Sequence, residues 1–264
     1  MSRITPTFEK LRQAGRPALM PYLTVGHPRP DLTVDLVSAA IEAGADLIEL
    51  GIPFSDPLAD GATIQQATHQ ALEHGTTVET CLQTVAELRR RGLETPLILM
   101  GYFNPIFQRG ITRFCANAAT AGADGLIVPD LPPEEADELR QACRAHDIDL
   151  IFLLAPTSDD ARIRRVVELS TGFIYLVSLI GVTGARDHLP ADLEAFVQRV
   201  REQTHLPLAV GFGIGSPEEA RRVARVADGV IVGSAIVRRA GESAEPVKTV
   251  RDFVQSLHQG LNIR

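Results

Sequence analysis

The sequence predicts an α/β fold, a single (β/α)8 TIM barrel with extra short helices that occupies residues 1–264 as one domain. Three observations support this prediction. Eight short apolar runs recur along the chain, amphipathic segments lie between them, and most of the runs lack the alternation of a half-exposed strand. A doubly wound open sheet is the alternative, but such a sheet rarely continues through eight uninterrupted units. No linker or shift in composition marks a second domain.

The predicted strands are continuously apolar, as expected for parallel strands that are buried on both faces. Several follow the same short motif of Ala, Gly and Asp, which leads from a helix end into the strand. Residues 43–46, 121–124 and 227–229 are the clearest copies. Glycine supplies the left-handed turn that ends the preceding helix. The strands are predicted at Ala18–Thr24, Leu47–Gly51, Pro96–Gly101, Gly125–Pro129, Leu150–Leu154, Phe173–Val177, Leu208–Gly213 and Val230–Gly233.

Helices are predicted between the strands from apolar periodicity and from residues that favour a helix start. Thr33–Ala43 places its apolar residues along one side, with Asp31 available as its N-cap. Pro133–His146 opens on proline and two glutamates, which suit a first helical turn. The other predicted helices are one after Ser216, two within residues 62–90 that break near Gly75, and a short one over Phe8–Gln13.

Composition and charge exclude several classes of function. A net charge of −7 and an isoelectric point near 5.5 argue against a nucleic-acid surface or a polybasic membrane patch. No apolar run reaches the length of a membrane span, and the first residues lack the apolar core of a secretion signal. Cys81, Cys115 and Cys143 are widely spaced, without a CxxC pair or a nearby His cluster. We therefore expect reduced thiols, no metal site and a cytoplasmic protein.

Two carboxylates lie in sharply different settings within Leu47–Gly61. Glu49 interrupts an apolar run that is predicted to be a buried strand, and Asp60 lies in the loop of Pro and Gly that follows. A charge inside a buried strand is costly unless it is paired, or protonated through a raised pKa. A carboxyl group of that kind at a strand end, with a second one on the adjoining loop, suits acid–base chemistry near neutral pH. The alternative is that Glu49 forms a structural salt bridge.

Active sites of such barrels lie at the C-terminal ends of the strands. The first six predicted strands end in a largely apolar mouth that contains Glu49 and suits a flat hydrophobic ligand. For each apolar residue alone, the alternative is a place in the barrel core. The other residues at this mouth are Tyr22, Met100, Ile127, Pro129, Leu153 and Tyr175.

The last three predicted strands end in glycine-rich turns. Residues 178–186 form a flexible loop of the kind that closes over a substrate, and residues 210–215 and 232–235 follow the seventh and eighth strands. Glycines at these two late loops often let backbone N–H groups bind a phosphate, and a helix N-terminus adds a favourable dipole. One Gly-x-Gly alone fits an ordinary turn. Three such turns in succession predict a phosphate site that needs no lysine.

Taken together, these residues resemble one family, the α subunit of tryptophan synthase, over nearly the whole chain. The strongest matching block is Leu47–Gly61, and residues 128–132, 175–178, 181–186 and 210–214 also match. The resemblance implies a carbon–carbon lyase of tryptophan biosynthesis. Such an enzyme splits indole-3-glycerol phosphate into indole and D-glyceraldehyde 3-phosphate.

The resemblance also assigns roles to residues. The family's acid–base carboxylates fall on Glu49 and Asp60, and its tyrosine beside the active site falls on Tyr175. Tyr22 stands where the family frequently has Phe, and Ala62 stands where many members have Pro. The implied phosphate-binding positions are Gly184, Gly213, Gly233 and Ser234. The implied indole pocket comprises Tyr22, Met100, Ile127, Pro129, Leu153 and Phe212.

The chemistry of the implied reaction agrees with these roles. Retro-aldol cleavage needs a proton on C3 of the indole and the loss of a proton from the side-chain hydroxyl beside the breaking bond. Glu49 in an apolar mouth suits this acid–base work. An ionised Asp60 can accept a hydrogen bond from the indole N–H and stabilise the positive charge that develops there. Phosphate binding anchors the substrate, and no metal or organic cofactor is expected in this chain.

The resemblance further implies a partner, the pyridoxal-phosphate-dependent β subunit, which receives indole through an interior channel within an α2β2 heterotetramer. The expected docking and switching loops contain Pro53 and Asp56 in one case and Thr183 and Arg186 in the other. Three alternatives stay open: a stand-alone lyase that releases free indole, a catalytically silent docking or allosteric barrel, and a barrel that acts on a different sugar phosphate.

Overall fold

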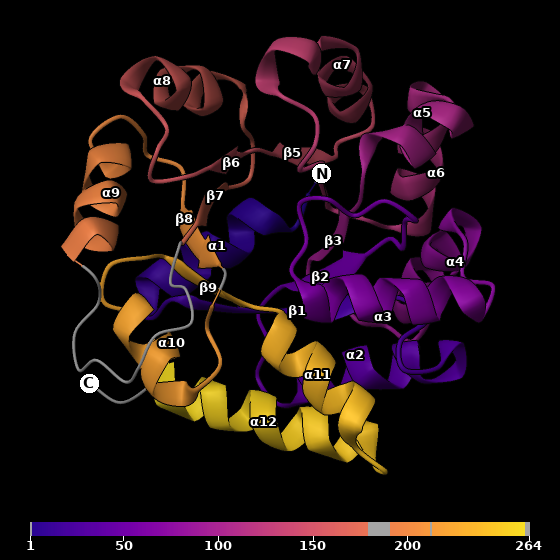
Figure 1. Cartoon of the computed structure of the whole chain (residues 1–264). Coiled ribbons are helices and arrows are strands. Elements are labelled where there is room, and N and C mark those ends of the chain that lie inside the picture. The colour runs from indigo at the N-terminus through magenta and orange to yellow at the C-terminus, as the bar shows by residue number, and fades with distance from the viewer. Residues whose placement is uncertain (1, 179–190, 212, 262–264) are drawn as a thin grey trace.

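The computed structural model describes residues 2–178, 191–211 and 213–261 of the chain. Within these residues, nine parallel strands form one sheet in the order β5-β4-β3-β2-β1-β9-β8-β7-β6. Helices surround the sheet (Figure 1). The strands are β1 (Ala18–Thr24), β2 (Ile48–Gly51), β3 (Leu97–Met100), β4 (Gly125–Ile127), β5 (Asp149–Ile151), β6 (Leu153–Leu154), β7 (Ile174–Val177), β8 (Leu208–Gly211) and β9 (Gly229–Val232).

The fifth predicted strand, Leu150–Leu154, is divided in two. β5 pairs with β4, β6 pairs with β7, and only Phe152 separates β5 from β6 along the chain. The two ends of the sheet are therefore neighbours in sequence, so the sheet curls into a barrel that is closed except at this break. The predicted barrel is confirmed. In the described part of the chain it has nine strands instead of eight because the predicted fifth strand is divided into β5 and β6.

The helices match most of the predicted segments and correct two of them. The stretch 62–90 forms two helices, as predicted. Asp31 is not the N-cap of the second helix, because it lies in a 3-10 turn that leads directly into that helix through Leu32. Pro133–His146 is not one helix but a 3-10 turn followed by a shorter helix.

Most of the described helices cover the outside of the barrel (Figure 1), and none of the described helices is long and apolar enough to cross a membrane. Their bounds are α1 (Ile4–Gln13), α2 (Thr33–Glu42), α3 (Ala62–Glu73), α4 (Val78–Arg90), α5 (Phe103–Arg109), α6 (Ile111–Ala121), α7 (Asp137–Ala145), α8 (Asp160–Leu169), α9 (Ala191–Arg201), α10 (Pro217–Val223), α11 (Ser234–Glu242) and α12 (Pro246–Leu261). The two 3-10 turns are η1 (Pro30–Leu32) and η2 (Pro133–Glu135).

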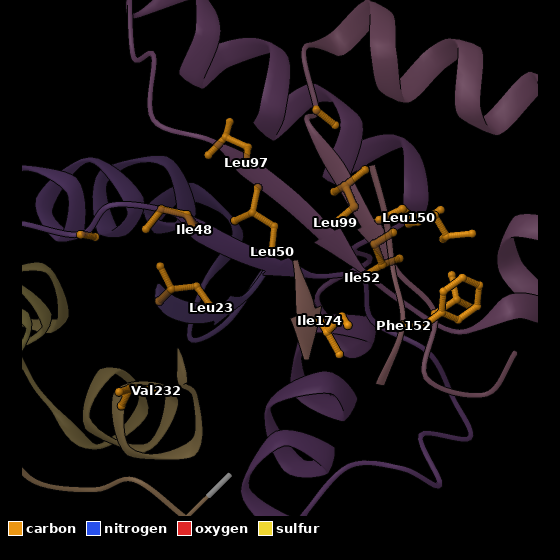
Figure 2. Packing of buried hydrophobic residues seen from close by; sticks show 14 of the residues in the cluster. Leu23, Ile48, Leu50, Ile52, Leu97, Leu99, Leu150, Phe152, Ile174 and Val232 are labelled. Atoms are coloured by element: carbon orange, nitrogen blue, oxygen red, sulfur yellow. The ribbon is translucent and has the colours of Figure 1, made fainter. Parts of the chain in front are cut away.

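Strand side chains alternate between two apolar clusters. Ile48 and Leu50 of β2 belong to the layer between the sheet and the helices, which is seen from close by in Figure 2. Because successive side chains of a strand point to opposite faces, Glu49 points the other way, into the barrel interior. The interior cluster contains Met20 and Tyr22 of the neighbouring β1. The sheet therefore places one acid among apolar side chains inside the barrel.

Helix α1 closes the end of the barrel where the strands begin. Phe8 is buried, and its ring centroid lies 5.8 Å from that of Phe173, the residue before β7. Ile4 and Leu11 of the same helix belong to the interior cluster as well. With this end closed, a ligand has to reach the interior from the C-terminal ends of the strands.

The recurring Asp before a strand fastens that strand to its neighbour. The carboxylate of Asp46, before β2, accepts a hydrogen bond from the backbone N–H of Leu19 in β1. Asp124, before β4, binds the N–H of Leu97 in β3 in the same way, and Asp228 binds that of Leu208. Each carboxylate also pairs with arginine: Asp46 with Arg16, Asp124 with Arg3 and Arg89, and Asp228 with Arg201. The Asp of the recurring sequence motif thus plays the same structural role at three strands.

Candidate active site

Glu49 is buried and has no polar partner. Its side chain is 0 % exposed, and neither carboxylate oxygen has a hydrogen-bond partner among the described residues. Burial alone raises the pKa of Glu49 to about 8. The alternative of a structural salt bridge is therefore wrong for the described part of the chain. A protonated acid at neutral pH that no described residue holds in a polar contact is available for proton transfer.

Tyr22 and Tyr175 lie in the same interior as Glu49, Tyr22 on the neighbouring strand and Tyr175 on a strand farther round the barrel. Tyr22 is the register partner of Glu49 on β1, and Tyr175 is buried on β7. Burial is the main cause of a raised pKa at both phenols, and the negative charge of Glu49 adds to it. Two glycines make room for the two rings: a Cβ on Gly51 would lie 2.0 Å from the Tyr22 hydroxyl, and one on Gly211 would lie 2.2 Å from that of Tyr175.

Asp60 lies half-buried on the loop between β2 and α3, beside these groups. Burial raises its pKa to about 6, although a hydrogen bond from Tyr102 opposes the shift. The Tyr102 hydroxyl donates to Oδ2 of Asp60 at 3.1 Å. The charge of Asp60 also raises the pKa of Tyr22. The structure therefore brings Asp60 into one electrostatic environment with Glu49.

Tyr102 is a site residue that sequence reasoning missed. Its hydroxyl accepts a hydrogen bond from the Ala59 amide at 2.9 Å, so it holds the loop as well as the carboxylate. Its ring centroid lies 5.3 Å from that of Phe54 on the same loop. The available signal was position, because Tyr102 comes two residues after Met100, at the end of a strand.

A cavity of about 510 Å³ opens beside Asp60 at the C-terminal ends of the strands. Met100, Pro129 and Leu153, three of the residues predicted at the mouth of the barrel, line it together with Ala59. Ile127 belongs to the interior cluster together with Tyr22 and Tyr175. The volume and the apolar lining fit a small aromatic ligand.

Of the predicted phosphate positions, the structure describes Gly213, Gly233 and Ser234. Gly233 is the N-cap of α11, and Ser234 is the first residue of that helix. A Cβ built on Gly233 would lie 3.5 Å from Cβ of Tyr22, so the start of α11 borders the same interior. The first N–H groups of a helix have no partner within it and attract anions. Gly213 adopts a left-handed backbone, with φ of +76°.

Some predicted site residues lie outside the described residues: Phe212 of the indole pocket, Gly184 of the phosphate site, and Thr183 and Arg186 of the partner loop. Of the other partner loop, Asp56 is exposed and Pro53 is buried. Ala62 is the first residue of α3, a position that also accepts proline readily. In the described part of the chain, no group of three or more His, Cys, Asp and Glu is placed to hold a metal ion.

Comparison with known proteins identifies the family. The family model described as tryptophan synthase alpha chain matches residues 8–262. The tryptophan synthase alpha chain of Chloroflexus aurantiacus is 58 % identical over 239 residues, which cover 90 % of each chain. That of Roseiflexus sp. is 55 % identical over 259 residues, or 97 % of this chain and 99 % of the relative.

Solved structures agree with this result. The tryptophan synthase subunit alpha of Legionella pneumophila has a TM-score of 0.93 and 41 % identity, and the match covers 99 % of both chains. A chain of Mycobacterium tuberculosis tryptophan synthase has a TM-score of 0.92 and 39 % identity, covering 100 % of this chain and 99 % of that one. The interior acid, the apolar cavity and the start of α11 therefore lie in a known scaffold, and this chain belongs to the tryptophan synthase alpha chain family.

Proposed function

We propose that this chain cleaves indole-3-glycerol phosphate into indole and D-glyceraldehyde 3-phosphate, as a carbon–carbon lyase of tryptophan biosynthesis. The observation that supports this most is Glu49, a fully buried carboxyl group without a polar partner among the described residues. It lies in the barrel interior together with two tyrosines, and this interior borders an apolar cavity. Membership of the family supports the same reaction.

Proton transfer in this reaction has two steps, in which one proton is given to the ring and another is taken from the side-chain hydroxyl. With a pKa of about 8, Glu49 is mostly protonated at neutral pH, so it can donate its proton to C3 of the indole ring. The resulting carboxylate then takes the proton of the side-chain hydroxyl while the bond from C3 to the side chain breaks. The electrons of that bond return to the ring, and Glu49 ends the cycle protonated.

Asp60 stabilises the charge that this cycle creates. Protonation of C3 leaves positive charge on the ring nitrogen, and the N–H of that nitrogen is a donor for an ionised carboxylate. With a pKa of about 6, Asp60 is mostly ionised at neutral pH. Two carboxyl groups with separated pKa values thus divide the work between proton transfer and charge stabilisation.

Phosphate binding sets the orientation of the substrate. The N-terminus of α11 at Gly233 and Ser234 borders Tyr22, and Tyr22 is in turn the register partner of Glu49. A phosphate held there by backbone N–H groups places the glycerol chain across the interior and the ring in the apolar cavity.

The direct test is product analysis with the purified chain. Incubation with indole-3-glycerol phosphate is expected to release indole and D-glyceraldehyde 3-phosphate in equal amounts, while the same compound without its phosphate reacts with a much higher KM. Release of a triose phosphate from another sugar phosphate, without indole, would instead support a different phosphate-binding barrel.

We further propose that a pyridoxal-phosphate-dependent β subunit docks over the loop of Asp56 and takes the indole, in an α2β2 assembly. The side chain of Leu58 on this loop is 91 % exposed, and that of Phe107 on the nearby α5 is 56 % exposed. Exposed apolar side chains next to an active-site loop favour a protein contact.

The partner can be tested by comparing indole release with and without the β subunit. We expect the isolated chain to be weakly active and the β subunit to raise its rate, because docking orders the loop that holds Asp60. Leu58→Asp should weaken this activation and leave the basal rate of the isolated chain nearly unchanged. Equal rates with and without the β subunit would favour a stand-alone lyase.

A further inference from the structure

Two thiols outside the candidate active site lie against each other between α6 and α7. The Sγ atoms of Cys115 and Cys143 are 3.8 Å apart. Both residues are free cysteines, and their exposed fractions are 0 % and 1 %. They belong to the layer between the sheet and the helices, and neither lines the cavity beside Asp60.

We propose that Cys115 and Cys143 form a reversible oxidation site, at which a small peroxide joins α6 to α7 through an intrachain disulfide. A disulfide bond is about 2.05 Å long, so the two sulfur atoms must approach each other by roughly 1.7 Å. If each sulfur makes half of this movement, each side chain turns by roughly 30° about its Cα–Cβ bond, which is at the limit of a rotamer well. The two helices pack against each other already, which keeps the two sulfurs in contact.

The oxidation balances with a peroxide as the only co-reactant. One of the two cysteines, as thiolate, attacks one oxygen of hydrogen peroxide and the O–O bond breaks, and the proton that left the thiol joins the leaving hydroxide, so that a sulfenic acid and one water result. The second sulfur then attacks the sulfenic sulfur, the S–S bond forms, the S–O bond breaks, and the hydroxide leaves as water with the proton of the second thiol. The two thiols lose two electrons and two protons in total, and the peroxide accepts them.

The two sulfurs differ in their readiness to ionise. The hydrogen bond between the thiols lowers the pKa of Cys115, while the same contact and burial raise that of Cys143. The contact thus favours one thiolate within the pair, which reacts with the peroxide, and the other sulfur then resolves the sulfenic acid. Both are buried, so we expect the reaction to be slow and to favour an oxidant near water in size over a bulky disulfide.

The bond has a structural consequence. It encloses residues 116–142, which contain β4 and the segment from Val128 to Leu131 beside the cavity. Closing a loop of this length restricts the unfolded chain. The oxidised protein should therefore unfold at a higher urea concentration than the reduced protein.

Cys81 provides an internal control. It is as buried as Cys115, burial raises its pKa, and the described structure places no second sulfur beside it. A reaction that depends on burial or general reactivity would oxidise all three cysteines. A reaction that depends on the sulfur pair spares Cys81.

The test treats the folded full-length chain with hydrogen peroxide, then unfolds it, alkylates the remaining thiols and measures the intact mass. We expect one alkylated thiol instead of three, located at Cys81 by peptide mapping, and recovery of all three after treatment with dithiothreitol. Cys81→Ala should still form the bond, whereas Cys115→Ala and Cys143→Ala should each block it. Circular dichroism of each variant before oxidation establishes that it is folded.

A chain unfolded in guanidinium before oxidation completes the design. There the three pairings differ only by loop length, so all three disulfides should form in comparable amounts. Exclusive pairing of Cys115 with Cys143 in the folded chain supports the proposal. Three alkylated thiols after oxidation, loss of Cys81 at the same rate, or the same mixture of pairings in the folded and unfolded chain would overturn it.

Discussion

The hydroxyl of Tyr102 lies 3.1 Å from Oδ2 of Asp60 and at the same time accepts a hydrogen bond from the Ala59 amide. One side chain after β3 thus fixes both the backbone of the loop after β2 and the carboxylate that this loop carries. The rigid barrel wall holds Glu49, whereas Asp60 depends on this contact between two loops.

Removing that hydroxyl should change the titration of Asp60. A hydrogen bond donated to a carboxylate favours its ionised form, so Tyr102→Phe is expected to raise the pKa of Asp60 above about 6. The acid limb of kcat/KM then moves to higher pH, and the activity near pH 6 falls several-fold. The alkaline limb, which reports Glu49, should not move. A parallel shift of both limbs would show that Tyr102 does not act on Asp60 alone.

The unmodified chain should have a bell-shaped pH profile. The proposed reaction needs Asp60 ionised, which occurs above a pKa of about 6, and Glu49 protonated, which holds below a pKa of about 8. The rate of cleavage is therefore expected to rise through pH 6 and fall through pH 8. Measurement of kcat/KM for indole-3-glycerol phosphate from pH 5 to 9 checks this. A flat profile over that range would contradict the assignment of these two groups.

Glu49 should also make folding depend on pH. Its pKa is about 8 in the folded chain and near 4.5 when exposed, so between these values the folded state binds more protons than the unfolded state. The free energy of unfolding therefore falls as the pH rises through this window. At pH 8 and above, Glu49→Gln should be more stable than the unmodified chain by roughly 2 to 5 kcal/mol, and the gap should close near pH 4. Urea unfolding at the two pH values measures it.

Asp124 should be important for stability rather than for catalysis. It is 1 % exposed, pairs with Arg3 and Arg89, and accepts the N–H of Leu97. Removing one partner of a buried ion pair leaves the others without compensation, so Asp124→Ala should lower the free energy of unfolding by about 3 kcal/mol or more. Asp31→Ala is the matched control, because its pair with Arg29 is exposed and should contribute nothing measurable. Equal urea midpoints for the two variants would contradict this view of Asp124.

The sequence was sufficient to predict the barrel because buried parallel strands appear in it as short apolar runs. The strand Ala18–Thr24 has the predicted bounds. It was not sufficient to divide Leu150–Leu154. That run is uniformly apolar, and the break at Phe152 arises because its two halves pair with strands on opposite sides. Such a division depends on how the sheet closes and leaves no mark in local composition.

The candidate site was predictable only where one residue type conflicted with its surroundings. Glu49 stood out as an acid in an apolar run. Tyr102 did not, because an aromatic residue after a strand is ordinary and its partner Asp60 lies 42 residues earlier in the chain. The role of Asp124 could not be predicted for the same reason. The sequence motif that contains it was recognisable, but its arginine partners come from distant segments.

The central claim is that Glu49 moves the proton in the cleavage of indole-3-glycerol phosphate. Glu49→Gln keeps the size and burial of the side chain and removes its titratable proton. Steady-state indole release and the Kd of an unreactive indole phosphate analogue, measured on the same preparation, test this claim most directly. We expect kcat to fall by a factor of 10² or more while the Kd changes little. Turnover within a few-fold of the unmodified chain would contradict the claim.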